Sequence, residues 1–370
     1  MKIFISEKQI AVFCTVPNTV NVFCLEKAEI IFSRTMDFEV EWAVILRKTQ
    51  YFALICHKKI SFWDDANSEI FAQLHMASSV LKMEFQQHHV FILCEHAMFV
   101  YEFPSMKQIW RSEKNSPQTF LSLFYDLDSK KVVFPAFSKT KVQVLCLDTM
   151  QSHAISVSES MVVYAQICPE GQWLATASEK GTLIRIFDME TGEPLKELRR
   201  GLEQVTISSL CFSCDRTWLA VASQKGTTHI FALNSIMAEE SVAKMSKSSE
   251  LKTSLLKMQR RFTQEEEEKE EKNMQMHMSS MSLPMNKKSA FSFAENYLPS
   301  YFQSEWSFAT FKLERFKGEI LCIFPPLAPF QPKSLQKLII INTTGHYWCT
   351  EFHIKYGGDC IVEKYTTLGF

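Results

Sequence analysis

The sequence predicts an all-β fold, a seven-bladed β-propeller, and three observations lead to it. A short apolar-aromatic strand phrase recurs seven times, a strand–turn–strand phrase is repeated almost unchanged, and the strand pattern is interrupted once. The chain has 370 residues, of which 46% are hydrophobic, so it can bury a large core. We therefore expect one folded unit over residues 1–370.

The recurring strand phrase sets the number of blades. Its first six copies follow each other at intervals of 38–44 residues, the period of a propeller blade built from several short strands. The seventh copy comes 117 residues after the sixth, which is one period plus an insertion of roughly 70 residues. The copies lie at Val22, Phe62, Val100, Val144, Ile186, Ile230 and Tyr347.

The two best-formed units are nearly copies of one another. WLATAS at residues 173–178 and WLAVAS at residues 218–223 alternate as strands do. A Lys-Gly turn follows each of them, at residues 180–181 and 225–226, and leads into an apolar-aromatic strand. These phrases predict two complete hairpins in blades five and six.

One segment departs from the strand pattern. Residues 234–304 contain four consecutive glutamates at 265–268, continue with further charges and lack glycine. Such blocks are usually solvated and mobile. We expect a long, charged, mobile loop within blade six, leaving the propeller after Leu233 and returning to a strand near Trp306.

Composition narrows the function and the location. Lys plus Arg (40) nearly equals Asp plus Glu (41), which excludes a general nucleic-acid binder. Eleven scattered cysteines, no apolar leader in the first 13 residues and no long apolar run predict a cytoplasmic chain with reduced thiols and only peripheral membrane contact. Few glycines, and no nucleophile-elbow, phosphate-loop or metalloprotease motif, predict no cofactor and no enzyme.

The sharpest chemical signal is Leu198-Arg199-Arg200-Gly201. Consecutive side chains of a strand point to opposite sides, so the two arginines can serve two pockets. The guanidinium fork matches phosphate oxygens. Hydroxyls and glycine turns recur at matching offsets on both sides of the motif. Backbone N–H groups at such turns can donate hydrogen bonds to an anion. The pattern predicts two phosphate pockets on one rim.

The residues of these pockets resemble a known family. The phrases at 178–187, 198–201 and 223–231, supported by 296–299, 308–310, 345–347 and 357–360, resemble the PROPPINs, the WD40-like, WD-repeat phosphoinositide-interacting (WIPI) proteins of autophagy. The resemblance implies a non-enzymatic adaptor that binds phosphatidylinositol 3-phosphate and phosphatidylinositol 3,5-bisphosphate in autophagosome formation. It further implies recruitment from the cytoplasm to phagophore, preautophagosomal and endosomal membranes, where other autophagy proteins are its partners.

By motif position, the resemblance assigns residues to each pocket. The first pocket would use Thr176, Ser178, Gly181, Thr182, Arg185 and Arg199. The second would use Arg200, Gly201, Ser223, Thr227 and His229.

The insertion contains one candidate for membrane contact. Four apolar residues recur at helical spacing and basic residues flank them, as in a helix that lies in a membrane interface. They are Leu251, Leu255, Met258 and Phe262. The acidic run that follows opposes binding to an anionic surface.

Other interpretations stay open at this point. The arginine pair can be a solvated edge in salt bridges with Glu197 or Glu203, and His229 can be an ordinary strand histidine. The protein as a whole can be a lipid-independent propeller scaffold for protein assembly. Cys211 and Cys214 have CxxC spacing, but the sequence has no second pair that could complete four zinc ligands. We therefore expect no metal site there or elsewhere.

Overall fold

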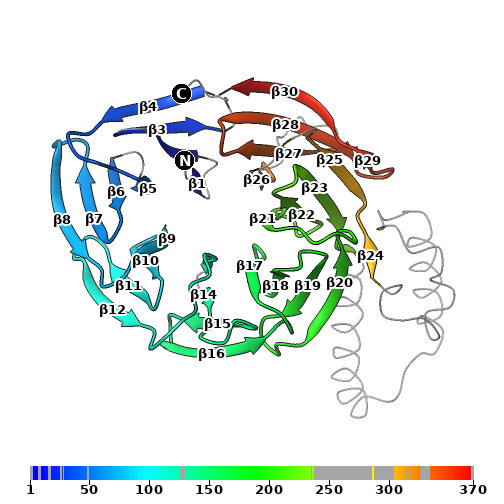
Figure 1. The fold of residues 1–370 in the computed structure, drawn as a ribbon, viewed down its shortest axis with the longest axis horizontal. Helices are drawn as coiled ribbons and strands as arrows, with labels where there is room; N and C mark the ends of the chain where they lie inside the picture. Colours follow the sequence, from blue (N-terminus) through cyan, green and yellow to red (C-terminus); the bar gives the residue numbers. More distant parts are fainter. Residues whose placement is uncertain are drawn as a thin grey trace, which may run out of the picture.

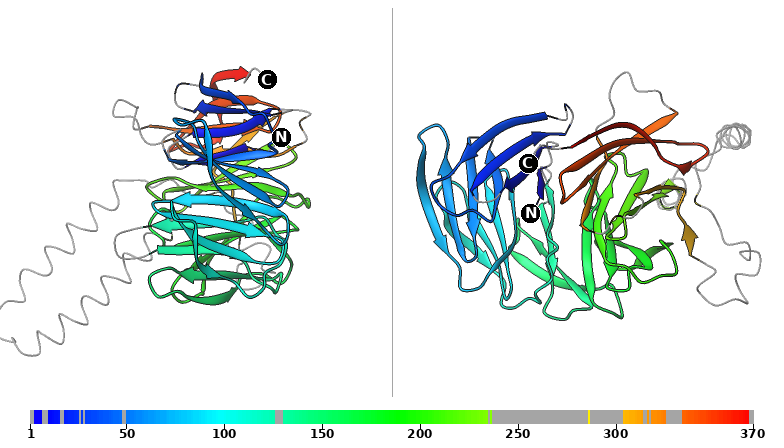
Figure 2. Two further views of the ribbon diagram at one scale, coloured as in Figure 1. Left: turned by 90° about the vertical axis from the view of Figure 1, so that its left-hand side faces the viewer. Right: turned by 45° about the horizontal axis from the view of Figure 1, so that its top comes forward.

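The computed structural model describes residues 3–6, 10–15, 18–25, 27, 29–47, 50–125, 130–234, 236, 286, 304–313, 316, 318–325 and 334–367. These residues form seven mainly antiparallel sheets that stand around one axis like blades (Figure 1). Seen from the side, the blades form a disc (Figure 2). The predicted seven-bladed β-propeller is confirmed.

Each of the first four blades is a four-stranded meander in chain order. Blade one contains β1 (Ile3–Ser6), β2 (Ile10–Thr15), β3 (Thr19–Cys24) and β4 (Glu29–Thr35). Blade two contains β5 (Trp42–Arg47), β6 (Tyr51–Cys56), β7 (Lys59–Asp64) and β8 (Glu69–His75). Blade three contains β9 (Val80–Gln86), β10 (His89–Cys94), β11 (Met98–Glu102) and β12 (Lys107–Arg111). Blade four contains β13 (Ser122–Tyr125), β14 (Lys130–Pro135), β15 (Lys141–Cys146) and β16 (Gln151–Ser156).

Blades five and six each have a fifth, short strand at the outer edge that comes from a later part of the chain. Blade five contains β17 (Val162–Ile167), β18 (Trp173–Ser178), β19 (Leu183–Asp188), β20 (Pro194–Arg199) and β24 (Glu305–Trp306). Blade six contains β21 (Ile207–Phe212), β22 (Trp218–Ser223), β23 (Thr227–Ala232), β25 (Ala309–Lys312) and β29 (Gly358–Asp359). Blade seven contains β26 (Ile320–Ile323), β27 (Leu335–Asn342), β28 (His346–His353) and β30 (Ile361–Thr367).

The repeated sequence phrase has one structural meaning throughout the ring. All seven copies lie on the third strand of their blade: β3, β7, β11, β15, β19, β23 and β28. In the first three blades this strand is buried along most of its length, and in blade seven buried and partly exposed residues alternate along it. Packing between neighbouring blades explains its apolar-aromatic residues. The two Trp-led phrases form β18 and β22, both buried along their whole length.

The return of the chain after residue 304 differs from the sequence prediction. One strand was expected from Trp306 onward, as the direct neighbour of the strand that ends near Leu233. Instead β24 pairs in parallel with β20 of blade five, and only β25 pairs with β23 of blade six. Ser307 and Phe308 lie between the two strands, so the chain crosses from one blade to the next. The length and mobility predicted for residues 234–304 concern residues that lie almost entirely outside the described ranges.

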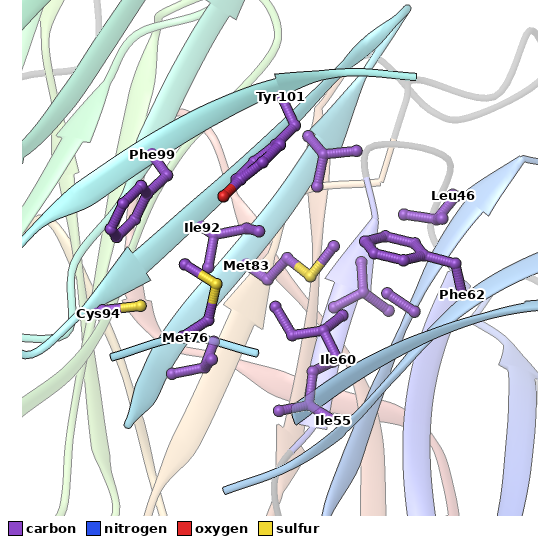
Figure 3. Packing of buried hydrophobic residues seen from close by; sticks show 14 of the residues in the cluster. Leu46, Ile55, Ile60, Phe62, Met76, Met83, Ile92, Cys94, Phe99 and Tyr101 are labelled. Carbon is purple, nitrogen blue, oxygen red and sulfur yellow. The ribbon is translucent and has the colours of Figure 1, made fainter. Parts of the chain in front are cut away.

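Apolar side chains fill the spaces between the blades. The cluster between blades two and three includes Ile55, Ile60, Phe62, Met83 and Ile92, all with no exposed surface, and Figure 3 shows their interlocking packing. The cysteines whose side chains are described are all free. Within the described ranges, no helix has the length and hydropathy needed to cross a membrane.

Candidate functional site

Two consecutive arginines end the outer strand of blade five. Arg199 is the last residue of β20, and Arg200 follows it on the connection to blade six. Both are buried, with 7% and 8% of their surface exposed. Arg199 pairs with Leu183 of β19, and the Arg200 N–H donates to the Thr182 carbonyl at 2.9 Å. Because successive side chains leave a strand on opposite sides, the two guanidinium groups meet different partners.

Arg199 belongs to a chain of four polar side chains. Its Nη2 donates to Oγ of Ser304 at 3.3 Å, and that hydroxyl donates to Oε1 of Glu197 at 3.1 Å. The other oxygen of the Glu197 carboxylate accepts a hydrogen bond from Nε of Arg185 at 3.1 Å. One carboxylate therefore serves two arginines: it accepts a hydrogen bond from Arg185 directly and contacts Arg199 through the Ser304 hydroxyl.

The predicted hydroxyl residues of the first pocket lie around this chain. Thr176 is in register with Arg185, and its hydroxyl donates to the Arg185 carbonyl at 3.4 Å. The carbonyl of Ser178 accepts the Gly181 N–H at 2.9 Å. These contacts fix the backbone conformation at the residues predicted to form the first pocket.

Arg200 is held by main-chain carbonyls. Its Nε donates to the Gly181 carbonyl at 3.1 Å, and its Nη2 donates to the Glu203 carbonyl. Burial lowers the pKa of Arg200, an effect that the Glu203 carboxylate partly opposes. That carboxylate itself pairs with Lys225, at 2.6 Å. A buried guanidinium whose donors meet neutral acceptors keeps its charge available for an incoming anion.

His229 of β23 lies within the electrostatic reach of Arg200. Its Nδ1 is 3.1 Å from Oγ of Ser307. Burial, reinforced by the positive charge of Arg200, lowers the pKa of His229 to about 4. The imidazole is therefore neutral near pH 7 and can donate or accept a hydrogen bond.

The two glycine turns repeat the same geometry in blades five and six. Gly181 and Gly226 both have a positive φ, of 60° and 86°. Each N–H donates to the carbonyl of the serine three residues earlier, Ser178 and Ser223. The Ser223 hydroxyl donates in turn to the Thr227 carbonyl at 3.2 Å. Gly181 serves both predicted pockets, because it belongs to the first turn and its carbonyl holds the arginine of the second.

Gly201 and Thr227 complete the set assigned to the second pocket. The N–H of Gly201 is 3.4 Å from the Thr182 carbonyl, so Thr182 holds both residues that follow β20. Thr227 begins β23 and pairs with Lys312 of β25.

Sequence reasoning missed two side chains of the site and gave a third, Glu197, a simpler role. Ser304 and Ser307 lie beyond the long insertion, more than 70 residues from the groups they contact, and no local pattern points to them. Glu197 was considered only as an ion-pair partner of the tandem arginines. Glu197 precedes Arg199 by two residues, and residues at this spacing lie on the same side of a strand. This spacing is the sequence signal that could have placed Glu197 beside Arg199. Arg200, by contrast, contacts the main chain of Glu203.

The other predictions have separate outcomes. Leu251, Leu255, Met258 and Phe262 lie outside the described residues, so their membrane contact stays a prediction. Cys211 is partly buried, and this burial raises the pKa of its thiol to about 11, whereas Cys214 is exposed.

Comparisons with known proteins show which family the chain resembles. The PROPPIN family model matches residues 62–267, more than half of the chain. Autophagy-related protein 18e of Arabidopsis thaliana is 33% identical over 176 residues, which are 47% of each chain. WD repeat domain phosphoinositide-interacting protein 2 of Gallus gallus is 30% identical over 166 residues, 43% of this chain and 38% of that protein. The chain thus spans about half the length of the curated relatives it matches.

A solved structure supplies the fold comparison. Hsv2 of Kluyveromyces lactis superposes with a TM-score of 0.68 at 17% identity, covering 98% of this chain and 97% of that one. This likeness shows the same fold over nearly the whole length. With the family model matched across blades two to six, the chain belongs to the PROPPIN family of β-propellers.

Proposed function

We propose that this protein binds phosphatidylinositol 3-phosphate and phosphatidylinositol 3,5-bisphosphate through two pockets, one at Arg199 and one at Arg200. It acts as a peripheral membrane adaptor in autophagosome formation, without catalysis. The observation that carries the proposal is the pair of adjacent, buried arginines that engage separate partners. Two such groups on one rim would bind two headgroups of the same membrane and gain affinity by avidity.

The chemistry of each pocket supports an inositol phosphate. Arg199 and Arg185 offer two planar forks around one carboxylate, and Arg200 offers a fork beside the neutral His229. Charge-assisted bonds from arginine to phosphate are stronger than bonds between neutral groups. The printed name of the Gallus gallus relative also describes a phosphoinositide-interacting protein.

The same reasoning extends to location and partners. A protein that recognises a lipid headgroup through a shallow rim is cytoplasmic until the lipid appears, and then gathers at that membrane. We propose phagophore, preautophagosomal and endosomal membranes as its sites of action and other autophagy proteins as its partners. The nearly neutral net charge of −1 is consistent with headgroup recognition rather than broad attraction to anionic surfaces.

A vesicle flotation assay tests this proposal. Vesicles containing either lipid are compared with vesicles of unphosphorylated phosphatidylinositol, using wild type, Arg199→Ala, Arg200→Ala and the double variant. We expect each single change to weaken binding by about tenfold and the double change to abolish it. Arg216→Ala is the matched control, because Arg216 is equally buried, at 9%, but lies in the turn between β21 and β22, where it ion pairs with Glu170 of blade five. Equal flotation of all variants would remove both pockets from consideration.

The alternative function is a lipid-independent scaffold, and one observation favours it. Glu197 already compensates Arg185 and reaches Arg199 through Ser304, so the first pocket is partly neutralised from within. This alternative predicts that wild type does not float with either lipid and that cell membranes recruit it through protein partners alone.

A further inference from the structure

Three chemically different donors meet beside the β6–β7 turn of blade two. Glu41 directly precedes β5, Cys56 ends β6, and His57 begins the turn to β7. A carboxylate oxygen, the thiol sulfur and an imidazole nitrogen of these residues all lie within 4.8 Å of one another. This group is remote in sequence from the tandem arginines, and the proposed lipid binding makes no use of it.

The backbone brings the imidazole to the same side as the thiol. Consecutive strand residues point to opposite faces, but His57 has a φ of 54°, in the left-handed region. Few non-glycine residues adopt this conformation, and here both carboxylate oxygens of Glu41 hold it. One accepts the His57 main-chain N–H at 3.1 Å, and the other contacts Nδ1 of the ring.

The donors stand on a rigid base. The Glu41 N–H donates to the Ile55 carbonyl at 2.9 Å, and the His57 carbonyl accepts the Val80 N–H at 3.2 Å. Ile55 and Ile60, at either end of the hairpin, have no exposed surface and belong to the cluster drawn in Figure 3. Side chains fixed in this way lose little conformational entropy on binding a ligand.

The local charge favours a cation. The carboxylates of Glu39 and Glu41 both act electrostatically on the Cys56 sulfur, and Lys59 opposes them. Glu41 and His57 are exposed and Cys56 is partly so, which leaves the donors open to an ion from solution.

We propose that Glu41, Cys56 and His57 form a Zn²⁺ site, with water in the fourth position. Sulfur, imidazole nitrogen and carboxylate oxygen are the ligands that zinc takes in proteins, and a tetrahedral site separates them by about 3.3–3.6 Å. The ion replaces the hydrogen bond between Nδ1 and the carboxylate. On binding, the imidazole proton resides on Nε2 and the thiol releases its proton to solvent. The sequence prediction of no metal site rested on the absence of a second cysteine pair, and it did not consider ligands brought together by a turn.

Zinc titration of the full-length, metal-free protein tests the site, with a chromophoric chelator as competitor. We expect one equivalent to bind, and Cys56→Ser or His57→Ala to weaken that binding by about tenfold or more. Cys214→Ser and His153→Ala are matched controls, because both residues are exposed and neither belongs to the group. With Co²⁺ as probe, wild type should show a thiolate-to-cobalt charge-transfer band that Cys56→Ser lacks.

Two results would overturn the proposal. One is zinc affinity that is unchanged in both Cys56→Ser and His57→Ala, which would place any bound zinc elsewhere. The other is the absence of stoichiometric binding to the wild type. Near-ultraviolet circular dichroism of the metal-free variants checks that they fold, and the exposed His57 gives a variant whose folding does not depend on filling the core.

Discussion

Single residues decide how the two arginines differ. Arg199 reaches a carboxylate through the Ser304 hydroxyl, whereas Arg200 is bonded to two carbonyl groups and lies near a neutral histidine. Arg199, at the end of β20, and Arg200, directly after it, thus have unequal electrostatic surroundings. For the proposed lipid binding, a phosphate at Arg199 would have to displace hydrogen bonds that lead to the Glu197 carboxylate, whereas the described hydrogen bonds of Arg200 go to carbonyl groups.

Glu197→Gln should strengthen lipid binding. The change removes the carboxylate that competes with phosphate for Arg185 and Arg199 and keeps an oxygen for the Ser304 hydroxyl. For a half-exposed pair the effect is about 0.5–1 kcal/mol, or roughly two- to fivefold in affinity. Vesicle flotation over a range of lipid content measures it. Glu190→Gln, an exposed change of the same charge in the turn after β19, is the control, and a loss of affinity in Glu197→Gln would contradict this account.

His229 should make the free energy of unfolding depend on pH in the acidic range. The folded protein keeps the imidazole neutral down to its pKa of about 4, against an ordinary value of 6.5, while the unfolded chain takes up a proton near the ordinary value. The free energy of unfolding therefore falls as pH falls through this window, by about 3 kcal/mol in total, and levels off below it. Urea unfolding of wild type and His229→Gln at a series of pH values measures the contribution, which should be missing from the variant. Parallel pH profiles would refute it.

At the scale of elements, the site depends on turns and on a crossing strand. The repeated glycine turns set the ends of β18–β19 and β22–β23, and β24 lies along β20 so that Ser304 reaches Arg199. Asn286 joins this arrangement, because its side-chain amide pairs with both the N–H and the carbonyl of Ala232 and also donates to Glu305. Glu305 ion pairs with Lys196 of the same blade at 2.6 Å, so Asn286 connects Ala232 of blade six to blade five.

Two glycines of the site should respond differently to alanine. A Cβ at Gly181, where φ is positive, would lie 1.8 Å from the Val205 carbonyl oxygen, whereas a Cβ at Gly201 would meet nothing within 4 Å. Gly181→Ala should lower the free energy of unfolding by more than about 2 kcal/mol and weaken lipid binding, because the carbonyl that holds Arg200 moves. Gly201→Ala should be nearly neutral for stability. Chemical denaturation compares the two, and equal stabilities would show that the turn tolerates a side chain.

Asn286→Asp should cost more stability than Asn286→Ala. The aspartate keeps the acceptor for the Ala232 N–H but sets a carboxylate against the Ala232 carbonyl and Glu305. We expect losses of about 2–3 kcal/mol for aspartate and about 1 kcal/mol for alanine. Thermal and urea unfolding of both variants give the order, and the reverse order would mean that the amide hydrogen bonds contribute little.

At the scale of the whole molecule, the ring is closed by side chains. Blades one and seven share no described strand, since blade one consists of β1–β4 and blade seven of β26, β27, β28 and β30. Phe23 and Leu25 of blade one pack against Ile339, Ile341 and Tyr347 of blade seven. The Tyr347 hydroxyl donates to the Leu25 carbonyl at 2.9 Å, which fixes the two ends of the propeller to one another.

Tyr347→Phe should loosen this closure. The change leaves the buried Leu25 carbonyl without its donor and should lower the free energy of unfolding by about 1–2 kcal/mol, with the fold retained. Tyr365→Phe, on the exposed β30, is the control. Equilibrium unfolding in urea measures both variants, and equal stabilities would show that apolar packing alone closes the ring.

Much of the fold follows from the sequence because its pattern is local and repeated. Strand alternation, the apolar third strands and the Lys-Gly turns are set by neighbouring residues, so their period predicts seven blades and places Arg199 and Arg200 on opposite sides of one strand. The resemblance to PROPPINs rests on the same contiguous phrases. These features needed no knowledge of distant contacts.

The tertiary structure alone decided which residues meet across blades. Ser304 reaches Arg199 and Ser307 reaches His229 over more than 70 intervening residues, and β24 joins blade five although its sequence continues into blade six. The meeting of Glu41 with Cys56 and His57 depends on a left-handed turn residue that no strand pattern predicts. Strand pairing and side-chain packing between segments distant in sequence are set by the closing of the ring, and local periodicity carries no information about them.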